Sequence, residues 1–249
     1  MKKILIASLF ASYLPLQAMA ADDWQFRIEP YGMVTSIDGD ADVGRVSGAE
    51  VAVDFNTILD NLDMAAMVHF EAHHESGWGV ILDYGFMDLS HEKSGRAGVV
   101  KASARQGVLE AFVNRRLVQN AGILDIYGGI RWWDNDLSLK VDPAAFPGSV
   151  SAKKNPDWVD PVIGMRWTQE TGSAWTPYVR GDIGGFGIES DFTWSTAAGV
   201  FYRFNDTVSL EIAYKATGVD YEEGRKGTPQ RFAYDTITHG PLFGLAFDF

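Results

Sequence analysis

Cysteine is absent from the 249 residues, so the chain has no disulfide, no cysteine-ligated zinc site and no thiol nucleophile. Basic residues are few, 21 Lys and Arg against 33 Asp and Glu. This balance argues against nucleic-acid binding, which depends on neutralising phosphates. Beyond residue 20 no run approaches the ~18 apolar residues of a membrane-spanning helix. An aromatic content of 13% with eight tryptophans excludes a disordered chain.

The first twenty residues have the order of a secretory signal peptide. Lys2 and Lys3 precede an apolar stretch over residues 4–16, and Ala18-Met19-Ala20 supplies the small residues of a cleavage site. The apolar stretch is shorter than the ~20 residues that a spanning helix needs. We therefore expect residues 1–20 to be removed and residues 21–249 to form one exported domain.

Apolar and polar residues alternate through most of the remaining chain. In the segment 79–89, for example, Val80, Leu82 and Tyr84 lie on one face of the predicted strand, and Asp83 lies on the other. Period 2 over ~10 residues predicts strands with one apolar and one polar face. The predicted strands are 24–36, 65–74, 78–89, 107–118, 123–134, 158–169, 175–186, 191–204, 207–218 and 236–249.

The connections between these strands alternate in length. Tight turns are predicted at 75–77, 119–122, 170–173 and 205–206, and much longer connections near 37–63, 90–106, 135–157 and 219–235. This asymmetry is typical of a transmembrane antiparallel up-and-down β-barrel with short periplasmic turns and long outer loops. The fold class is therefore all-β with about ten strands. Eight or twelve remain open, depending on how segments such as 51–55 are counted.

The tryptophans favour the membrane barrel over a soluble β-sandwich, because they fall at the two ends of the predicted strands in two belts, as at the two lipid–water interfaces. Trp24, Trp78, Trp167 and Trp175 lie beside the short turns, and Trp132, Trp133, Trp158 and Trp194 toward the long loops. Trp158 has the parity of the barrel interior, so it is expected above the apolar band.

Residues 51–62 carry a local pattern of their own. Residues 50–54 alternate like a strand, whereas Ile58, Leu59 and Leu62 would form one apolar side of a short helix. Such a helical turn would either plug the barrel mouth or cap its rim, and the sequence leaves both open.

Several segments resemble a family of uncharacterised Gram-negative outer-membrane proteins. Residues 53–63 contain the pattern F-x-x-I-L-D-N-L, and further matching stretches are 157–164, 181–187, 202–206 and 240–241. The chain is similar in kind to small OmpA- and OmpW-like barrels. Its C-terminal Phe247-Asp248-Phe249 resembles the signal that the barrel-assembly machinery recognises. The resemblance implies fold and outer-membrane location, and it brings no activity.

Charged residues gather at positions with inward parity. A narrow barrel of eight to ten strands has little free lumen, so mixed charges favour a packed, ion-paired and closed interior. The alternative is a selectivity lining for a narrow channel that carries small solutes or ions. The predicted lumen residues are Asp83, Glu110, Asp125, Arg131, Asp160, Arg166, Arg180, Asp182, Arg203, Glu211 and Lys215.

Histidines are the candidates for catalysis. A barrel hydrolase or acyltransferase needs a nucleophile or water, a base and an orienting acid brought together, and no such spacing stands out. We interpret the histidines as solvated or interfacial. The five are His69, His73, His74, His91 and His239. We therefore expect no enzyme, and a lipid- or peptide-modifying barrel enzyme is the last alternative.

Asp38, Asp40 and Asp42 form a D-x-D-x-D run in the first long connection. Clustered carboxylates suit hard cations, but Ala49 stands where an EF-hand has its bidentate Glu. Weak divalent-cation binding is the most this run predicts, and no other cofactor is expected.

The sequence thus predicts a monomeric outer-membrane barrel with a structural or surface-interaction role. Its expected partners are outer-membrane lipid and lipopolysaccharide, and the barrel-assembly machinery during biogenesis.

Overall fold

The computed structural model describes residues 23–44, 46–95, 98–119, 122–143 and 149–249. The predicted signal peptide lies outside these residues. In the described part of the chain no helix is long and apolar enough to cross a membrane.

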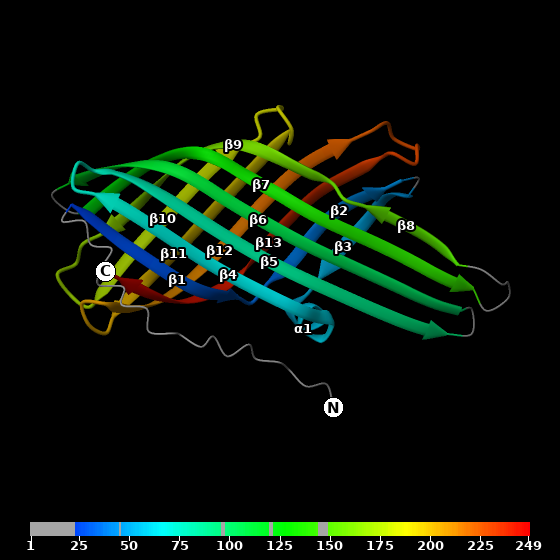
Figure 1. Cartoon of the computed structure of the whole chain (residues 1–249), viewed down its shortest axis with the longest axis horizontal. Coiled ribbons are helices and arrows are strands. Elements are labelled where there is room, and N and C mark those ends of the chain that lie inside the picture. The colour runs from blue at the N-terminus through cyan, green and yellow to red at the C-terminus, as the bar shows by residue number, and fades with distance from the viewer. Residues whose placement is uncertain (1–22, 45, 96–97, 120–121, 144–148) are drawn as a thin grey trace.

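One sheet accounts for nearly all of the described residues (Figure 1). The short α1 spans Phe55–Asn61. The strands are β1 (Trp24–Met33), β2 (Ser36–Val43), β3 (Val46–Val53), β4 (Leu62–His74), β5 (Trp78–Gly95), β6 (Gly98–Gln119), β7 (Gly122–Pro143), β8 (Val150–Lys154), β9 (Asp157–Gln169), β10 (Trp175–Gly184), β11 (Phe192–Arg203), β12 (Val208–Glu223) and β13 (Phe232–Asp248).

Ten of these strands form the barrel wall, which confirms the predicted fold. The antiparallel order runs from β1 through β4, β5, β6, β7, β9, β10, β11 and β12 to β13, and β13 pairs back with β1. The ends of the chain are bonded where the wall closes, since Phe249 N donates to Phe26 O at 2.9 Å. β2 continues the course of β1 along the other half of β13, while β3 and β8 are additions outside the ten.

Short connections lie at the barrel end where β1 begins and β13 ends. They link β4 to β5, β9 to β10 and β11 to β12. Gly77 in the first of them has a φ of 85°, a conformation that glycine adopts without steric cost. The three predicted turns that fall on described residues are confirmed, and the fourth includes residues 120–121, which lie outside them.

The wall has apolar side chains outside and charged side chains inside. Ile126, Ile163 and Met165 are about half exposed or more, whereas Asp125, Arg131 and Asp160 are fully buried. A soluble barrel would have the opposite arrangement. The inside-out polarity is that of a barrel that spans a membrane.

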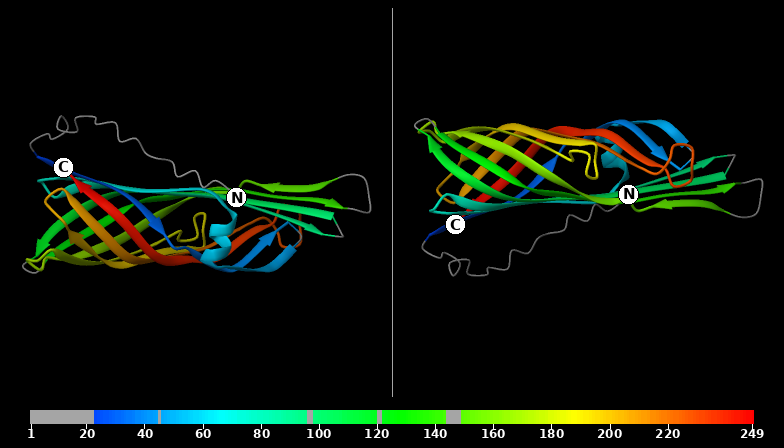
Figure 2. Two further views of the ribbon diagram at one scale, coloured as in Figure 1. Left: turned by 90° about the horizontal axis from the view of Figure 1, so that it is seen from below. Right: turned by 90° about the horizontal axis from the view of Figure 1, so that it is seen from above.

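At the other end the sheet continues well beyond the predicted strand ends (Figure 2). β5 and β6 pair as far as Gly95 and Gly98, and β7 runs to Pro143 before β8 pairs back against it. We call this projection the outer tongue. A second projection, the hairpin lobe, consists of β2, β3 and the outer ends of β12 and β13.

Most of the predicted long outer loops are therefore wrong as loops. Segments near 90–106, 135–157, 37–63 and 219–235 are largely strands. The reason is a change of polarity along the strands: residues facing outward become polar. On β5, β6 and β7 the outward-facing cross-strand row of Tyr84, Leu109 and Trp132 is followed, two outward-facing rows later, by Asp88, Arg105 and Asp136. This reversal marks the outer border of the apolar band.

The segment 51–62 divides as the sequence pattern suggested. Residues 51–53 belong to β3, which pairs only with β2, so the wall keeps ten strands. Asp54 caps α1 by accepting a hydrogen bond from Thr57 N at 2.7 Å, and this bond holds the pKa of Asp54 below its usual value. Asn61 Oδ1 contacts His91 Nδ1 of β5 at 2.7 Å. α1 thus lies at the rim beside the tongue, as a cap.

Candidate functional site: the polar lumen

Ten of the eleven predicted lumen residues lie inside the barrel. Arg203 is the exception: it is exposed at the end of β11 and donates to Ser173 O in a short turn at 3.4 Å. The others belong to six wall strands. They converge in the lumen because every second side chain along a strand points to the inner face of the wall. The residues in the interior are Asp83, Glu110, Asp125, Arg131, Asp160, Arg166, Arg180, Asp182, Glu211 and Lys215.

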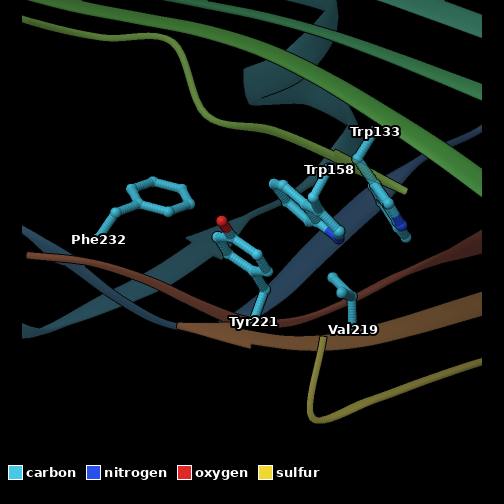
Figure 3. Packing of buried hydrophobic residues seen from close by; sticks show 5 residues of the cluster. All are labelled: Trp133, Trp158, Val219, Tyr221 and Phe232. Atoms are coloured by element: carbon cyan, nitrogen blue, oxygen red, sulfur yellow. The ribbon is translucent and has the colours of Figure 1, made fainter. Parts of the chain in front are cut away.

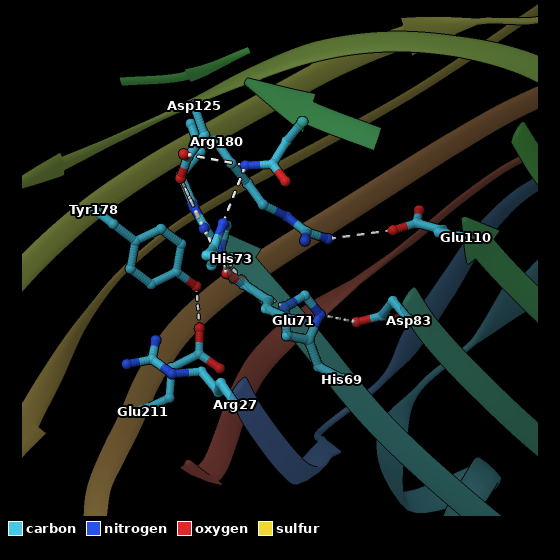
Figure 4. A network of polar contacts seen from close by, with 12 residues as sticks. Arg27, His69, Glu71, His73, Asp83, Glu110, Asp125, Tyr178, Arg180 and Glu211 are labelled. Atoms are coloured by element: carbon cyan, nitrogen blue, oxygen red, sulfur yellow. Dashed lines mark hydrogen bonds and ion pairs between the residues drawn. The ribbon is translucent and has the colours of Figure 1, made fainter. Parts of the chain in front are cut away.

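Glu71 is the centre of a first cluster (Figure 4). His69 Nε2 lies 2.8 Å from Glu71 Oε1, and His73 Nε2 lies 2.6 Å from Glu71 Oε2. Arg166 lies on β9, which is not a neighbour of β4 in the wall. Its Nη2 donates to Glu71 Oε2 at 2.8 Å and to Asp125 Oδ2 at 2.9 Å. One carboxylate therefore ties β4 to β9 across the lumen.

The same cluster continues toward the short turns. Arg116 Nε donates to Asp125 Oδ1 at 2.9 Å, and Asn114 Nδ2 donates to the same oxygen at 3.2 Å. Arg116 Nη2 also lies 3.0 Å from His73 Nε2. Asp125 is fully buried, and its two oxygens receive bonds from β6 and β9, so its charge is well compensated.

Arg131 is the centre of a second cluster. Its Nε donates to Glu110 Oε1 at 2.8 Å, its Nη2 to Asp182 Oδ1 at 2.8 Å and its Nη1 to Thr193 Oγ1 at 3.1 Å. Arg180 Nη2 lies 3.6 Å from Glu110 Oε2. The Arg131 side chain has no solvent exposure, and it links β6, β7, β10 and β11.

Asp83 connects the strands on the remaining side. It receives Tyr31 Oη at 2.8 Å and faces His69 Nδ1 at 2.9 Å. Lys215 Nζ is an ion-pair partner at 3.7 Å. Tyr31, Asp83 and Lys215 line both of the described interior cavities, so they form the septum between them.

The two cavities are small. The lower one, toward the short turns, has a volume of about 40 Å³ and includes Glu29 and Glu211 in its lining. The upper one has a volume of about 100 Å³ and an apolar lining that includes Met67, Met87 and Trp133. The lower cavity has room for a few waters, since one water needs ~10–15 Å³ by this measure.

Aromatic rings close the interior above the charged clusters (Figure 3). Trp133 and Trp158 stack at 5.6 Å between centroids, and Trp158 stacks on Tyr221 at 3.9 Å. Both indole N–H groups donate to Asp160 Oδ2 at 3.1 Å, and Ser190 Oγ donates to the same oxygen at 2.7 Å. The stack joins β7 and β9 to β12, on a different part of the wall.

This stack corrects part of the predicted tryptophan belt. Trp133 and Trp158 are 4% and 3% exposed, inside the barrel, because their positions have inward parity. Trp132, which is outward, is 38% exposed and Trp78 at the other end is 55% exposed. The belt toward the tongue therefore rests on fewer rings than the sequence suggested.

The histidines are more buried than predicted. His69 and His73 are less than one tenth exposed, and sequence reasoning missed them, together with Glu71, as lumen residues. Their shared inward parity with the predicted charges was the available signal. His74 lies at a short turn, with Nδ1 2.8 Å from Ser76 Oγ. His239 lies on the outward face, 2.6 Å from Tyr214 Oη and 2.9 Å from Asp38 Oδ2.

The three aspartates of the D-x-D-x-D run do not converge. Asp38 pairs with His239, while Asp42 accepts hydrogen bonds from Gly48 N at 2.7 Å and Arg231 Nε at 3.0 Å. The irregularity of register between residues 41 and 43 of β2 turns Asp42 away from the exposed face of Asp38 and Asp40. Within the described ranges no group of three acidic or histidine side chains is placed to hold a metal ion.

No protein-family model and no curated protein matches the chain. Solved structures with a similar fold include the outer membrane protease OmpT from Escherichia coli, at 9% identity over 92% of this chain and 98% of that chain, with a TM-score of 0.43. Ail, the attachment invasion locus protein of Yersinia pestis, solved with the heparin analogue sucrose octasulfate, is 10% identical over 91% and 99%, with a TM-score of 0.38. The outer membrane protein OprG from Pseudomonas aeruginosa is 9% identical over 91% and 95%, with a TM-score of 0.33. At these values the similarities carry no functional inference for this chain.

Proposed function

We propose that the protein is a monomeric barrel of the Gram-negative outer membrane with a closed polar lumen and a structural or surface-interaction role. The observation that carries the proposal is the compensation of the lumen charges: Arg131, Arg166 and Asp125 each bond to two or more partners on different strands. An ion path would require these bonds to open. The outer tongue and the hairpin lobe project beyond the apolar band, where they are available to partners.

The apolar outer wall and the resemblance of residues 53–63 to uncharacterised outer-membrane proteins support this location. Lipid and lipopolysaccharide are the partners that such a wall would contact. Assembly would use the barrel-assembly machinery, with Phe247 and Phe249 as the signal. In the structure Phe249 ends the strand that closes the barrel against Phe26.

The test is single-channel conductance of the refolded protein in planar bilayers, with heat-modifiable gel mobility as the proof of folding. A general porin reconstituted in the same bilayers serves as the positive control. We expect a folded and silent protein. Discrete, ion-selective openings would contradict the closed lumen and favour the narrow channel, and substitution of Arg131 or Asp160 should then shift the ion selectivity.

An enzyme stays outside the proposal. The buried His69 and His73 contact carboxylates, an arginine and an asparagine, and none of these is the hydroxyl or thiol nucleophile of an acyl-transfer triad. His239 does lie between a hydroxyl and an acid, but the hydroxyl is the phenol of Tyr214. We assign this trio to the outer interface of the wall, where tyrosines are common in membrane barrels.

A further inference from the structure

The barrel wall has a seam between β1 and β4. The two strands pair from Trp24 and His74 as far as Pro30 and Val68, and no pairing continues beyond. Pro30 has no N–H to donate, and β1 turns away, since Val34 N donates to Pro241 O on β13 at 2.8 Å. Among the described strands, the edge of β4 from Met67 to Leu62 therefore has no partner on this side (Figure 1).

The seam lies at the outer edge of the apolar band. In the cross-strand rows Val68 is level with Tyr84, on the apolar side of the polarity reversal, and Met64 is level with Asp88, on the polar side. Residues 63–66 of β4 are exposed at consecutive positions. Because consecutive strand positions point to opposite faces, this segment is accessible from both faces.

The upper cavity lies directly behind the seam. Its lining includes Tyr31, Met33 and Thr35 from the β1 side and Met67 from the β4 side. Its volume of about 100 Å³ is of the same order as the ~150 Å³ apolar cavity that accommodates benzene in an engineered protein. Methionine side chains adapt to ligands of different shape, and three of them, Met33, Met67 and Met87, line this cavity.

The floor of the upper cavity has polar groups that lack hydrogen-bond partners. Lys215 Nζ has Asp83 Oδ1 as its ion-pair partner at 3.7 Å, which is beyond hydrogen-bond distance. Glu110 Oε2 is buried and receives no hydrogen bond. Both residues line the cavity. A donor without an acceptor and an acceptor without a donor suit a head group that does both.

We propose that the upper cavity binds a small uncharged amphipathic molecule, with an aromatic or short aliphatic body and one hydroxyl head, that enters from the lipid side through the β1–β4 seam. The body would occupy the methionine-lined space, and the hydroxyl would accept from Lys215 and donate to Glu110. Such a molecule reaches the site without crossing the ion-paired clusters below. The site is therefore compatible with a lumen closed to ions.

The absence of cysteine makes a single-thiol test possible. In the variant Met67→Cys, folded protein in lipid vesicles is treated with N-ethylmaleimide, and the rate of modification is followed by mass spectrometry. Met64→Cys, on the outward face of the same strand and 55% exposed at the native residue, is the accessible control. Ala197→Cys, at a position 3% exposed beside the lower cavity, is the buried control.

The probes are benzyl alcohol and ethylbenzene, which have the same number of heavy atoms and differ in the hydroxyl. Met67→Cys should react faster than Ala197→Cys, and benzyl alcohol should slow its reaction saturably while leaving Met64→Cys unaffected. Half-maximal protection by ethylbenzene should need about a tenfold higher concentration than protection by benzyl alcohol. A tenfold difference in affinity is of the order that one hydrogen bond to a charged group contributes. Lys215→Met should remove this preference, and Lys215→Arg should keep it.

Three results would overturn the proposal. A Met67→Cys thiol as inert as Ala197→Cys means that the seam is closed. Protection that rises linearly with either probe means partition into lipid without a site. Equal protection by the two probes with Lys215 present means that the floor does not recognise a hydroxyl. If Lys215→Met fails the heat-modifiability test, the comparison of the two probes on the Met67→Cys variant alone decides.

Discussion

In the membrane half of the barrel, toward the short turns, charged side chains fill the interior and apolar side chains face outward. In the outer half the interior is aromatic and the outward side chains are polar. Arg131, Asp125 and Asp160 are fully buried in or at the edge of the first region. Trp158 and Tyr221 form the core of the second, beneath strands whose outward residues are polar. The barrel interior thus complements what surrounds the wall: lipid requires an apolar outside, whereas water permits an apolar core like that of a soluble protein.

The two regions differ also in what a substitution leaves behind. Removing one partner from a buried ion pair leaves a charge without compensation. Removing a ring from an aromatic core leaves a cavity, into which neighbours can partly relax. The two cores should therefore respond differently to substitution.

Arg131→Met should have the largest effect, because two buried carboxylates, Glu110 and Asp182, lose the guanidinium cation that they share. We expect a loss of about 5 kcal/mol of folding free energy, the upper end of the ~3–5 kcal/mol for breaking a buried pair. Denaturant titration followed by gel mobility measures it. Arg203→Met, at the exposed end of β11, is the control and should change stability by no more than about 0.5 kcal/mol. Equal effects would show that the lumen charges are not a stabilising core.

Trp158→Ala should come next, at about 3–4 kcal/mol, since truncation of a buried aromatic residue leaves a large cavity. Because this core lies in the outer half, the loss should concentrate there. Hydrogen exchange of β12 beyond Val219 should rise while β9 near Met165 stays protected. Uniform exchange through the whole barrel would mean that the two cores melt as one unit.

Ile130→Arg tests the polarity of the wall. Ile130 is 44% exposed on the outward face of β7, in the cross-strand row of Leu82 and Ala111, and an arginine on the lipid face costs about 2–4 kcal/mol near the midplane. Ser138→Arg is the matched variant on the outward face of the same strand, beyond the polarity reversal, and should cost less than about 1 kcal/mol. The measurement is refolding yield and stability in lipid vesicles. Similar costs at the two positions would place both in the same surroundings.

Acid should loosen the hairpin lobe with the smallest effect. The hydrogen bond from Gly48 N, and then the Arg231 guanidinium, hold the pKa of Asp42 below its usual value. A lowered pKa contributes stability above the unfolded-state value of about 3.9, and that stability is lost as pH falls through the folded-state pKa. Hydrogen exchange over residues 36–53, corrected for intrinsic rates, should accelerate at acid pH. Asp42→Asn should show the accelerated exchange already at neutral pH, and the same pH response in wild type and variant would rule Asp42 out as its cause.

Alternation was enough to predict ten wall strands and the inward positions of Asp83, Glu110 and Arg131, because lipid outside and charge inside impose period 2 on every strand. It failed beyond Leu89 and Asp134, where the outward face becomes polar and the pattern resembles a loop. For the same reason the sequence places Trp133 and Trp158 in the belt toward the long loops, with Trp158 above the apolar band, whereas both rings lie in an aromatic core. Alternation specifies two faces, and it does not say which solvent touches each.

Partners across the lumen were beyond the sequence. Glu71 and Arg166 are 95 residues apart, and only closure of the sheet brings them into contact. The sequence therefore predicts His69 and His73 as solvated or interfacial, whereas the structure places them on either side of a buried carboxylate. The D-x-D-x-D run shows the converse: Asp42 is close to Asp38 and Asp40 in sequence, and a local change of register in β2 turns it to the other face.

The sequence by itself determined the barrel class, a strand number of about ten and the side of the wall on which most residues lie, since these follow from local periodicity and turn spacing. The tertiary structure decided which charges pair, where the aromatic stack crosses the interior, and where β1 and β4 separate. These features depend on contacts between strands distant in the chain, on the closure of the sheet and on the bend that carries β1 into β2 along β13. Periodicity within a strand contains no information about any of them.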